Sequence, residues 1–298
     1  MSFVTPTANA RVRLLITGET GSGKTTSLLT FPARRVVMSY PGEHGYGSLP
    51  VGDPDTLVFA WEEKDLQMDS TQVVDEVDRR TREVIAGKHG PVHTFCGDGL
   101  HKFYEYILDS LSGGNYFAGS PVQDETKDNP DVLSPKVFGQ AKRRLARYLH
   151  EIGQSPVPIA VFTAWDNDKG TRKALQGEHW SKVPTAKYPA FFGGTVARDI
   201  LGEFTTGVVH SSRGRLKPTD TEATWRWQTR PSAGIVAAAL KAPKEVATLV
   251  PPYVAADWGV LGKFLEPPSG GVSNVSGLAP QPSPGKPSSA TPATGSRT

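Results

Sequence analysis

Hydrophobic and polar positions alternate along residues 11–265 in a pattern that predicts strands and helices in turn. Short apolar runs bounded by glycine, proline or polar residues predict buried strands at 11–17, 35–39, 56–61, 92–96 and 159–164. Apolar residues that recur every three or four positions predict helices at 25–31, 70–86, 100–111 and 135–152. Strands that alternate with helices favour a mostly parallel sheet with helices on both faces.

The pattern changes after residue 204. Residues 204–211 and 223–229 form two further strand-like runs, and in the second Trp225 and Trp227 alternate with polar residues. This period of two predicts an antiparallel hairpin at an edge of the sheet. The predicted fold class is therefore α/β, with a mostly parallel sheet and a hairpin edge.

Composition divides the chain into three parts. Residues 1–10 are too few for a domain and form an N-terminal extension, while 11–265 carry the α/β domain. Residues 266–298 are dominated by Pro, Gly and Ser and contain no aromatic residue, which predicts a disordered tail.

Overall composition excludes several classes of protein. Of the 298 residues 37% are hydrophobic, enough for a sizeable core, and the single Cys96 excludes an internal disulfide framework. No apolar run is long enough to cross a membrane and the first residues lack a secretory core, so we expect a cytoplasmic protein without a membrane partner. A net charge of +3 is too small to indicate nucleic-acid binding by itself.

The strongest chemical signal is the sequence GETGSGKT at residues 18–25, which fits the phosphate-loop pattern GxxxxGK[ST]. Its glycines let backbone N–H groups approach phosphate oxygens, and the following helix directs its positive end at the same anion. Lys24 supplies a charge to the β- and γ-phosphates, whereas Glu19 is expected to point to solvent because it would repel them. The predicted nucleotide-binding residues are Gly18, Glu19, Thr20, Gly21, Ser22, Gly23, Lys24, Thr25 and Thr26.

Magnesium requires oxygen ligands beside this loop. The hydroxyl of Thr25 and the carboxylate of Asp98, which comes after a buried strand and before a helix, are the predicted metal ligands. Asp98 could instead cap the following helix, and Asp166 is another acid that could hold the metal.

A hydrolytic base is predicted at Glu43, on the loop that leaves the second strand. A carboxylate there can reach a water in line with the γ-phosphate, so Lys24 and Glu43 are the predicted catalytic residues; the alternative is a solvated loop glutamate. Trp165 follows the strand at 159–164 and is expected in the core or at the rim of the site.

Together these motifs resemble the RecA-type branch of P-loop ATPases, in particular the compact RecA-like ATPases encoded by phages, some of which act in single-strand DNA annealing and recombination. The resemblance covers residues 11–265. It is carried by GETGSGKT at 18–25, Glu43-His44, Asp98 with its helix, IAVFTAW at 159–165 and KYPAFFGG at 187–194. In that family the glutamate at the position of Glu43 resembles the water-activating base, although Pro41 stands here where the family usually has a second acid.

The resemblance implies an ATPase that uses ATP and Mg²⁺, forms a homo-oligomeric ring or filament, and works in the host cytoplasm if a phage encodes it. It also places mobile loops against single-stranded DNA. The expected DNA-binding residues lie in the predicted loop 166–188 and are Lys169, Arg172, Lys173, Trp180 and Lys182. The other loop, 113–134, is acidic and counts against DNA, and a cation for hydrolysis in the neighbouring subunit could come from Arg213, Arg215, Lys217 or Arg226.

Three functions remain open from the sequence. The first is a DNA-dependent ATPase that acts on single-stranded DNA in phage-type recombination or replication. The second is an ATPase whose nucleotide controls a protein partner without DNA binding. The third is a small-molecule kinase, because that class shares the phosphate loop.

Overall fold

The computed structural model describes residues 11–43, 45–50, 52–61, 67–114, 116–117, 135–176, 179–189, 205–231, 239–240 and 249–265. From residue 167 to 189 it describes the backbone alone. Every described element belongs to the unit Met1–Pro267. The extension 1–10 and the tail 266–298 lie outside the described residues, so the predicted domain boundaries stay predictions.

A 10-stranded sheet forms the centre of the described chain. Its strands are β1 (Val12–Gly18), β2 (Arg35–Ser39), β3 (Thr56–Phe59), β4 (Thr94–Asp98), β5 (Ile159–Gln176), β6 (His179–Pro189), β7 (Gly207–Gly214), β8 (Thr224–Gln228), β9 (Ala239–Leu240) and β10 (Tyr253–Ala255). The main order is β10-β8-β7-β1-β5-β4-β2-β3, and all neighbours from β7 to β3 are parallel. The predicted α/β class with a mostly parallel sheet is confirmed.

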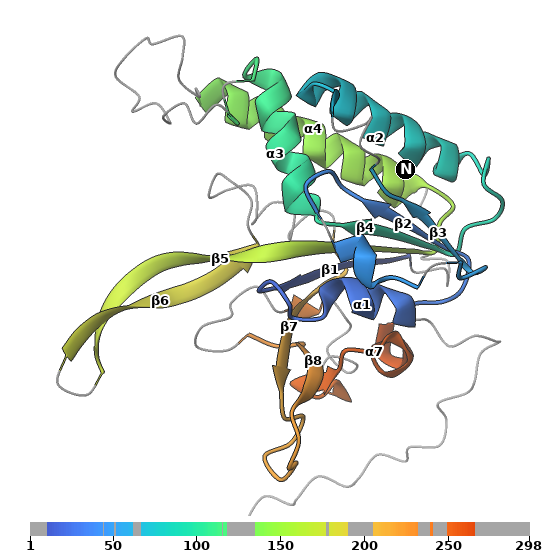
Figure 1. The fold of residues 1–298 in the computed structure, drawn as a ribbon. Coiled ribbons are helices and arrows are strands. Elements are labelled where there is room, and N and C mark those ends of the chain that lie inside the picture. The colour runs from blue at the N-terminus through green and yellow to red at the C-terminus, as the bar shows by residue number, and fades with distance from the viewer. Residues whose placement is uncertain are drawn as a thin grey trace, which may run out of the picture. The chain divides into compact units, whose positions relative to one another are not determined.

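Helices cover both faces of this sheet (Figure 1). Helices α2 (Ser70–Ile85), α3 (Leu100–Leu111) and α4 (Pro135–Gln154) lie on one face, and α1 (Lys24–Ser27) and α7 (Trp258–Leu265) on the other. Two short 3-10 turns, Leu28–Thr30 and Gly45–Ser48, complete the helical elements. The predicted helix at 25–31 is therefore one turn of α-helix that tightens into a 3-10 turn before Pro32.

Alternation along the strands divides the apolar side chains between two cores. On β1, Leu15 packs with the cluster under α2, α3 and α4, whereas Leu14 and Ile16 belong to the cluster on the opposite face. Successive side chains of a strand point to opposite faces, so a strand covered on both sides is apolar throughout. This explains why β1 is buried along its whole length.

The register brings the ends of four strands to one edge. Gly18 of β1 is level with Trp165 of β5, and Ser39 of β2 is level with Asp98 of β4. Strand β4 begins and ends two residues later than the predicted strand at 92–96. Asp98 is therefore its last residue and not a residue beyond it. The carboxyl ends of parallel strands form the usual ligand-binding edge of an open α/β sheet.

The prediction of a loop over residues 166–188 is wrong. Strand β5 continues past the sheet to Gln176, and β6 returns antiparallel to it from Gln176↔His179 to Asp166↔Pro189 (Figure 1). The segment is mostly polar in sequence, so hydrophobic alternation gave no sign of a strand. Pairing of the two strands satisfies their backbone N–H and C=O groups whatever the side chains are.

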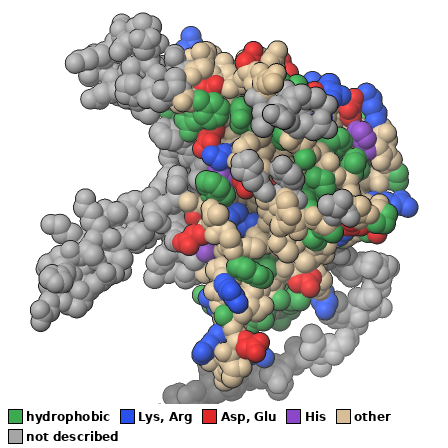
Figure 2. Space-filling model, viewed as in Figure 1, with side chains coloured by type: hydrophobic (Ala, Val, Ile, Leu, Met, Phe, Trp, Pro, Cys, Tyr) green, Lys and Arg blue, Asp and Glu red, His purple; other side chains and the backbone are tan. Residues whose placement is uncertain are grey.

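The predicted hairpin at the edge is confirmed as β7 and β8, paired from His210↔Gln228 to Gly214↔Thr224. Strand β10 adds to its outer side. On the face shown in Figure 2, Lys and Arg side chains gather over the turn of this hairpin, where Arg213, Arg215 and Lys217 are exposed. No described helix has both the length and the apolar character that crossing a membrane requires.

Candidate nucleotide-binding and active site

The phosphate loop connects β1 to α1 and is held in shape by its neighbours. Gly21 and Gly23 have φ angles of 74° and 80°, which only glycine adopts without strain, and they turn the loop back before α1 begins. The hydroxyl of Ser211 on β7 donates to the carbonyl of Ser22 at 2.7 Å. The loop therefore lies between the end of β1 and the start of a helix, the position that exposes backbone N–H groups to an anion.

Lys24 is buried although it carries a charge. Its ammonium donates to the carbonyls of Gly18 and Glu19 at 2.9 and 2.8 Å, within the same loop. Burial lowers the pKa of Lys24, while the carboxylates of Glu43 and Asp166, with smaller effects from others, act in the opposite direction. Glu19 itself is exposed, as its place in the loop predicts.

Asp98, at the end of β4, is hydrogen-bonded to the first turn of the helix that follows the phosphate loop. Its Oδ2 accepts a hydrogen bond from the Thr25 hydroxyl at 2.8 Å, and its Oδ1 accepts one from Thr163 of β5 at 2.5 Å. The alternative that Asp98 caps the next helix is wrong, because α3 has Gly99 at its N-cap without a side-chain cap. Strand β5 lies between β1 and β4, so it borders both the phosphate loop and the strand that carries Asp98.

Thr163 makes two buried hydrogen bonds that hold Asp98 in this position: besides donating to Asp98, its hydroxyl accepts from the Gly99 N–H at 2.8 Å. We expect Thr163→Val to lower the free energy of unfolding by about 1–3 kcal/mol, because both partners stay buried without a hydroxyl. Thr163→Ser keeps the hydroxyl and is the control. Urea unfolding of both variants measures the difference, and an equal loss in Thr163→Ser would show that the methyl group matters instead.

Glu43 reaches the same edge through a tight turn after β2. The Glu43 N–H donates to the Tyr40 carbonyl at 3.0 Å, and the turn between them contains Pro41 and Gly42, with φ 78° at the glycine. Proline followed by a glycine of positive φ is the signature of a type II β-turn. Pro41 thus helps to turn Glu43 toward the phosphate loop.

The Glu43 carboxylate is half-buried, and its Oε2 has no hydrogen-bond partner among the described residues. Burial and the nearby charge of Asp98 raise the pKa of Glu43 to about 7, against the opposite effects of Lys24 and Lys102. Burial likewise raises the pKa of Asp98, although Thr163 and Thr25 donate to it. Glu43 and Asp98 both act on Lys24, and the second lysine near Glu43, Lys102, is itself paired with Glu105 at 2.9 Å. The carboxylates therefore outnumber the unpaired cations, and a divalent cation would neutralise the excess.

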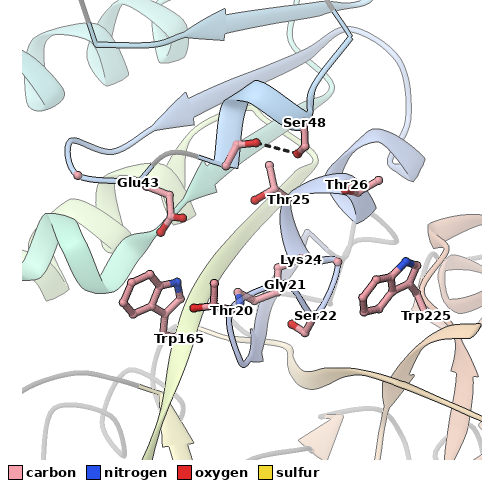
Figure 3. A pocket seen from close by; sticks show the side chains of 13 residues that line it. Thr20, Gly21, Ser22, Lys24, Thr25, Thr26, Glu43, Ser48, Trp165 and Trp225 are labelled. Atoms are coloured by element: carbon pink, nitrogen blue, oxygen red, sulfur yellow. Dashed lines mark hydrogen bonds between the residues drawn. The ribbon is translucent and has the colours of Figure 1, made fainter. Parts of the chain in front are cut away.

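A cavity of about 500 Å³ lies beside Lys24, Thr25 and Glu43. Its lining comes from the phosphate loop, from two tryptophans, Trp165 and Trp225, and from four residues after β2, namely Gly42, Glu43, Gly45 and Ser48. Figure 3 shows Glu43 and Trp165 on one side of the loop and Trp225 on the other. The volume is within the range of small-molecule sites.

Trp165 forms the wall on the side of Glu43. Its ring lies 4.7 Å from that of His101 and 5.0 Å from the ammonium of Lys102, and the backbone N–H of Trp165 donates to His101 Nδ1 at 3.4 Å. Burial lowers the pKa of His101 to about 3, so this imidazole is neutral. Trp165 is thus a rim residue supported by α3.

Asp166 acts on Lys24, but one of its carboxylate oxygens is paired with a histidine of β7. Its Oδ2 lies 2.7 Å from Nε2 of His210 on β7, and both side chains are buried. Asp98, by contrast, contacts the loop hydroxyl that would share a metal. The arrangement therefore favours Asp98 over Asp166 as the metal ligand.

The structure describes the remaining predicted residues only in part. Lys169, Arg172, Lys173, Trp180 and Lys182 belong to the hairpin β5–β6, where the backbone alone is described. Arg226 donates to the carbonyl of Arg215 and packs over the Tyr253 ring at 4.1 Å, so it is held within its own subunit. His44 and most of 187–194 lie outside the described residues.

No protein-family model and no curated protein matches the chain. Two solved structures have a similar fold. One is a prototypical ATPase from the type III secretion system of pathogenic bacteria, 14% identical over 67% of this chain and 50% of its own, with a TM-score of 0.37. The other is the assembled ATPase EscN from the enteropathogenic E. coli type III secretion system, 13% identical over 68% of this chain and 43% of its own, with a TM-score of 0.35.

The chain thus spans no more than half the length of either protein. Likeness at this level says nothing about what the chain binds or does. Its function has to be argued from the geometry of the site.

Proposed function

We propose that this protein is a Mg²⁺-dependent ATPase that works on single-stranded DNA in phage-type recombination or replication. The observation that carries the ATPase proposal is the contact between Thr25 and Asp98 beside a phosphate loop, with the unpaired carboxylate of Glu43 on the same cavity. The loop supplies the binding site for the phosphates, Thr25 and Asp98 supply oxygen ligands for the metal, and Glu43 supplies the base.

The phosphate loop binds and orients the triphosphate. Its N–H groups and the start of α1 favour the phosphate oxygens, and Lys24 exchanges backbone carbonyls for those oxygens. Of the predicted loop residues, 20–26 line this cavity without a gap, whereas Glu19 lines the smaller cavity beside it and Gly18 lines neither. Phosphoryl transfer depends mainly on such positioning and on charge stabilisation.

Thr25 and Asp98 would hold the Mg²⁺. Their hard oxygen atoms and the surplus of negative charge around them suit this ion, which prefers one or two carboxylates plus phosphates to a complete protein cage. When bound, Mg²⁺ neutralises charge on the β- and γ-phosphates. Thr163 keeps the Asp98 carboxylate aimed at Thr25.

Glu43 would act as the base. The oxygen of a water attacks the γ-phosphorus while the bond to the ADP oxygen breaks, and a carboxylate oxygen of Glu43 takes the water's proton. A pKa near 7 suits this task, because the group is then both ionised and basic at neutral pH. Trp165, Gly45 and Ser48 line the cavity beside Glu43 and would limit the access of other water molecules.

Release of inorganic phosphate from ATP by the full chain, with and without Mg²⁺, tests this function directly. Turnover that depends on Mg²⁺ supports it. A protein that transfers the γ-phosphate to a small molecule but not to water would instead be a kinase.

The hairpin β5–β6 supports the DNA part of the proposal. It continues directly from the strand that carries Thr163 and Trp165. Residues opposite one another in an antiparallel pair share a face, and Lys173 pairs with Lys182 while Leu175 pairs with Trp180. Lys169 falls on the same face by alternation and Arg172 on the other.

This face is the more suitable one for a nucleic acid. Over the described length of the hairpin it holds three lysines, Trp180 and Tyr188 but no acid, whereas the opposite face holds two basic and two acidic residues. Lysines interleaved with aromatic residues suit the backbone and bases of single-stranded DNA.

We expect Lys169→Ala, Lys173→Ala and Lys182→Ala together to weaken single-stranded DNA binding. Each lost phosphate contact removes about 0.7 from the slope of log K against log salt, so the triple variant should lose about 2. Fluorescence anisotropy over a salt series measures this. Lys187→Ala, on the opposite face, is the control and should leave the slope unchanged.

Two results would contradict this assignment of the hairpin. Equal slopes for the triple variant and the wild type would place DNA elsewhere on the protein. Absence of DNA binding by the wild type would favour the alternative, an ATPase that controls a protein partner.

A homo-oligomeric ring or filament also belongs to this proposal. Arg215 and Lys217 are exposed on the turn of β7–β8 and would be placed to reach a neighbouring active site, as arginine fingers do. Arg213, at the end of β7, is also exposed but lies over the ring of Trp225. Arg226 suits this role less, because its guanidinium is held against Tyr253.

A further inference from the structure

We infer that the indole of Trp225 is the stacking platform for the base of the nucleotide. This inference rests on the proposed nucleotide site and adds to it the side on which the nucleoside lies. Trp225 comes from the edge strand β8 and is remote in sequence from every part of the phosphate-loop motif.

The direction of the bound triphosphate follows from the site. Asp98, Thr25 and Glu43 gather where the γ-phosphate and the metal would lie. The α-phosphate and the nucleoside must then leave the loop on the side away from Glu43. In Figure 3 this is the side of Thr26 and Trp225.

Trp225 is placed to meet a base there. A Cβ atom built on Gly23 would lie 3.0 Å from Cδ2 and 3.2 Å from Cε3 of the indole, so the ring is in contact with the phosphate loop itself. The indole is 39% exposed, one of the most exposed large apolar side chains among the described residues. It lines both the 500 Å³ cavity and a second cavity of about 380 Å³ next to the loop.

The surroundings of the ring favour stacking over a merely structural role. The other tryptophan of this strand, Trp227, is fully buried and packs near Phe31 with a ring distance of 6.1 Å, so β8 is anchored without Trp225. The guanidinium of Arg213 lies 5.8 Å from the centre of the Trp225 ring and is exposed. A flat ring beside a cation suits a base that carries phosphates.

Binding of two Mg²⁺-loaded ligands tests the inference, namely ATP and inorganic tripolyphosphate, which has the phosphates but no base. For Trp225→Ala we expect the ATP affinity to fall by about 5- to 100-fold, the usual effect of removing one stacking ring. The tripolyphosphate affinity should stay within about twofold of the wild type. GTP should lose as much as ATP, because stacking does not read the edges of the base.

Two variants control this experiment, which uses titration calorimetry on the full chain. Trp225→Phe keeps a ring and should retain most of the ATP affinity. Phe117→Ala removes an exposed aromatic side chain that packs on Tyr106 and Tyr116, and it should change neither affinity.

Each outcome has a distinct meaning. Equal losses for ATP and tripolyphosphate in Trp225→Ala would mean that the indole only supports the phosphate loop, and no loss for either would place the base elsewhere; both overturn the inference. A wild-type protein that binds neither ligand would instead refute the nucleotide site itself.

Discussion

Lys24→Ala is expected to abolish ATP turnover. The ammonium is the positive group closest to the predicted phosphates, and the loss of one such donor typically costs about 10²–10³-fold in kcat. Here the effect should be at the upper end or beyond, because Glu43, Asp98 and Asp166 all act on Lys24 and would be left to repel the phosphates. Binding of both ATP and tripolyphosphate should weaken as well.

The fold of this variant should persist, since Lys24 belongs to neither hydrophobic core. Lys88→Ala is the matched control, because it removes an exposed lysine whose contact is with Glu83 on the distant end of α2. Phosphate release and thermal unfolding are measured on both. Wild-type turnover by a correctly folded Lys24→Ala would refute the phosphate-loop assignment.

The elements that the sequence predicts well are those encoded by neighbouring residues. The apolar run of β1 and the helical stripe of α3 are local patterns, so both elements occur close to their predicted positions. The phosphate loop is contiguous as well, and Gly23 and Lys24 are predictable from a single stretch. Glu43 could be proposed because it follows a recognisable strand.

The contacts between strands were not predictable in the same way. Thr163 touches Asp98 because β5 lies next to β4, an adjacency between residues 65 positions apart. The one available signal was a hydroxyl residue inside the otherwise apolar run of residues 159–164. A polar residue in a buried strand needs a partner, yet the sequence does not say which.

Trp225 and the long hairpin illustrate the same limit. Alternation predicted β8 as a strand, but Trp225 meets the phosphate loop only because β7 pairs with β1. In β5–β6 the backbone hydrogen bonds define the hairpin, and its polar side chains resemble those of a loop. Hydrophobic periodicity cannot detect a strand whose sequence is polar on both faces.

Glu43→Gln is expected to separate binding from turnover. The amide keeps the size of the side chain but cannot accept the proton of the attacking water, so kcat should fall by about 10²-fold or more while ATP still binds. Single-turnover hydrolysis and titration with ATP measure the two effects. Glu151→Gln, on a partly exposed helix position, is the control and should behave as wild type.

The pH profile makes the same prediction sharper. Burial and Asp98 raise the pKa of Glu43 to about 7, and the group is active only when it is deprotonated. In the wild type, kcat/KM should therefore be level above pH 7 and fall about tenfold per pH unit below it, because kcat/KM reports the free enzyme. In Glu43→Gln this fall should vanish along with most of the activity.

An ordinary, solvated glutamate would ionise near pH 4.5 and leave the wild-type profile flat between pH 5.5 and 8. A flat profile together with near-normal turnover by Glu43→Gln would place the base on another residue.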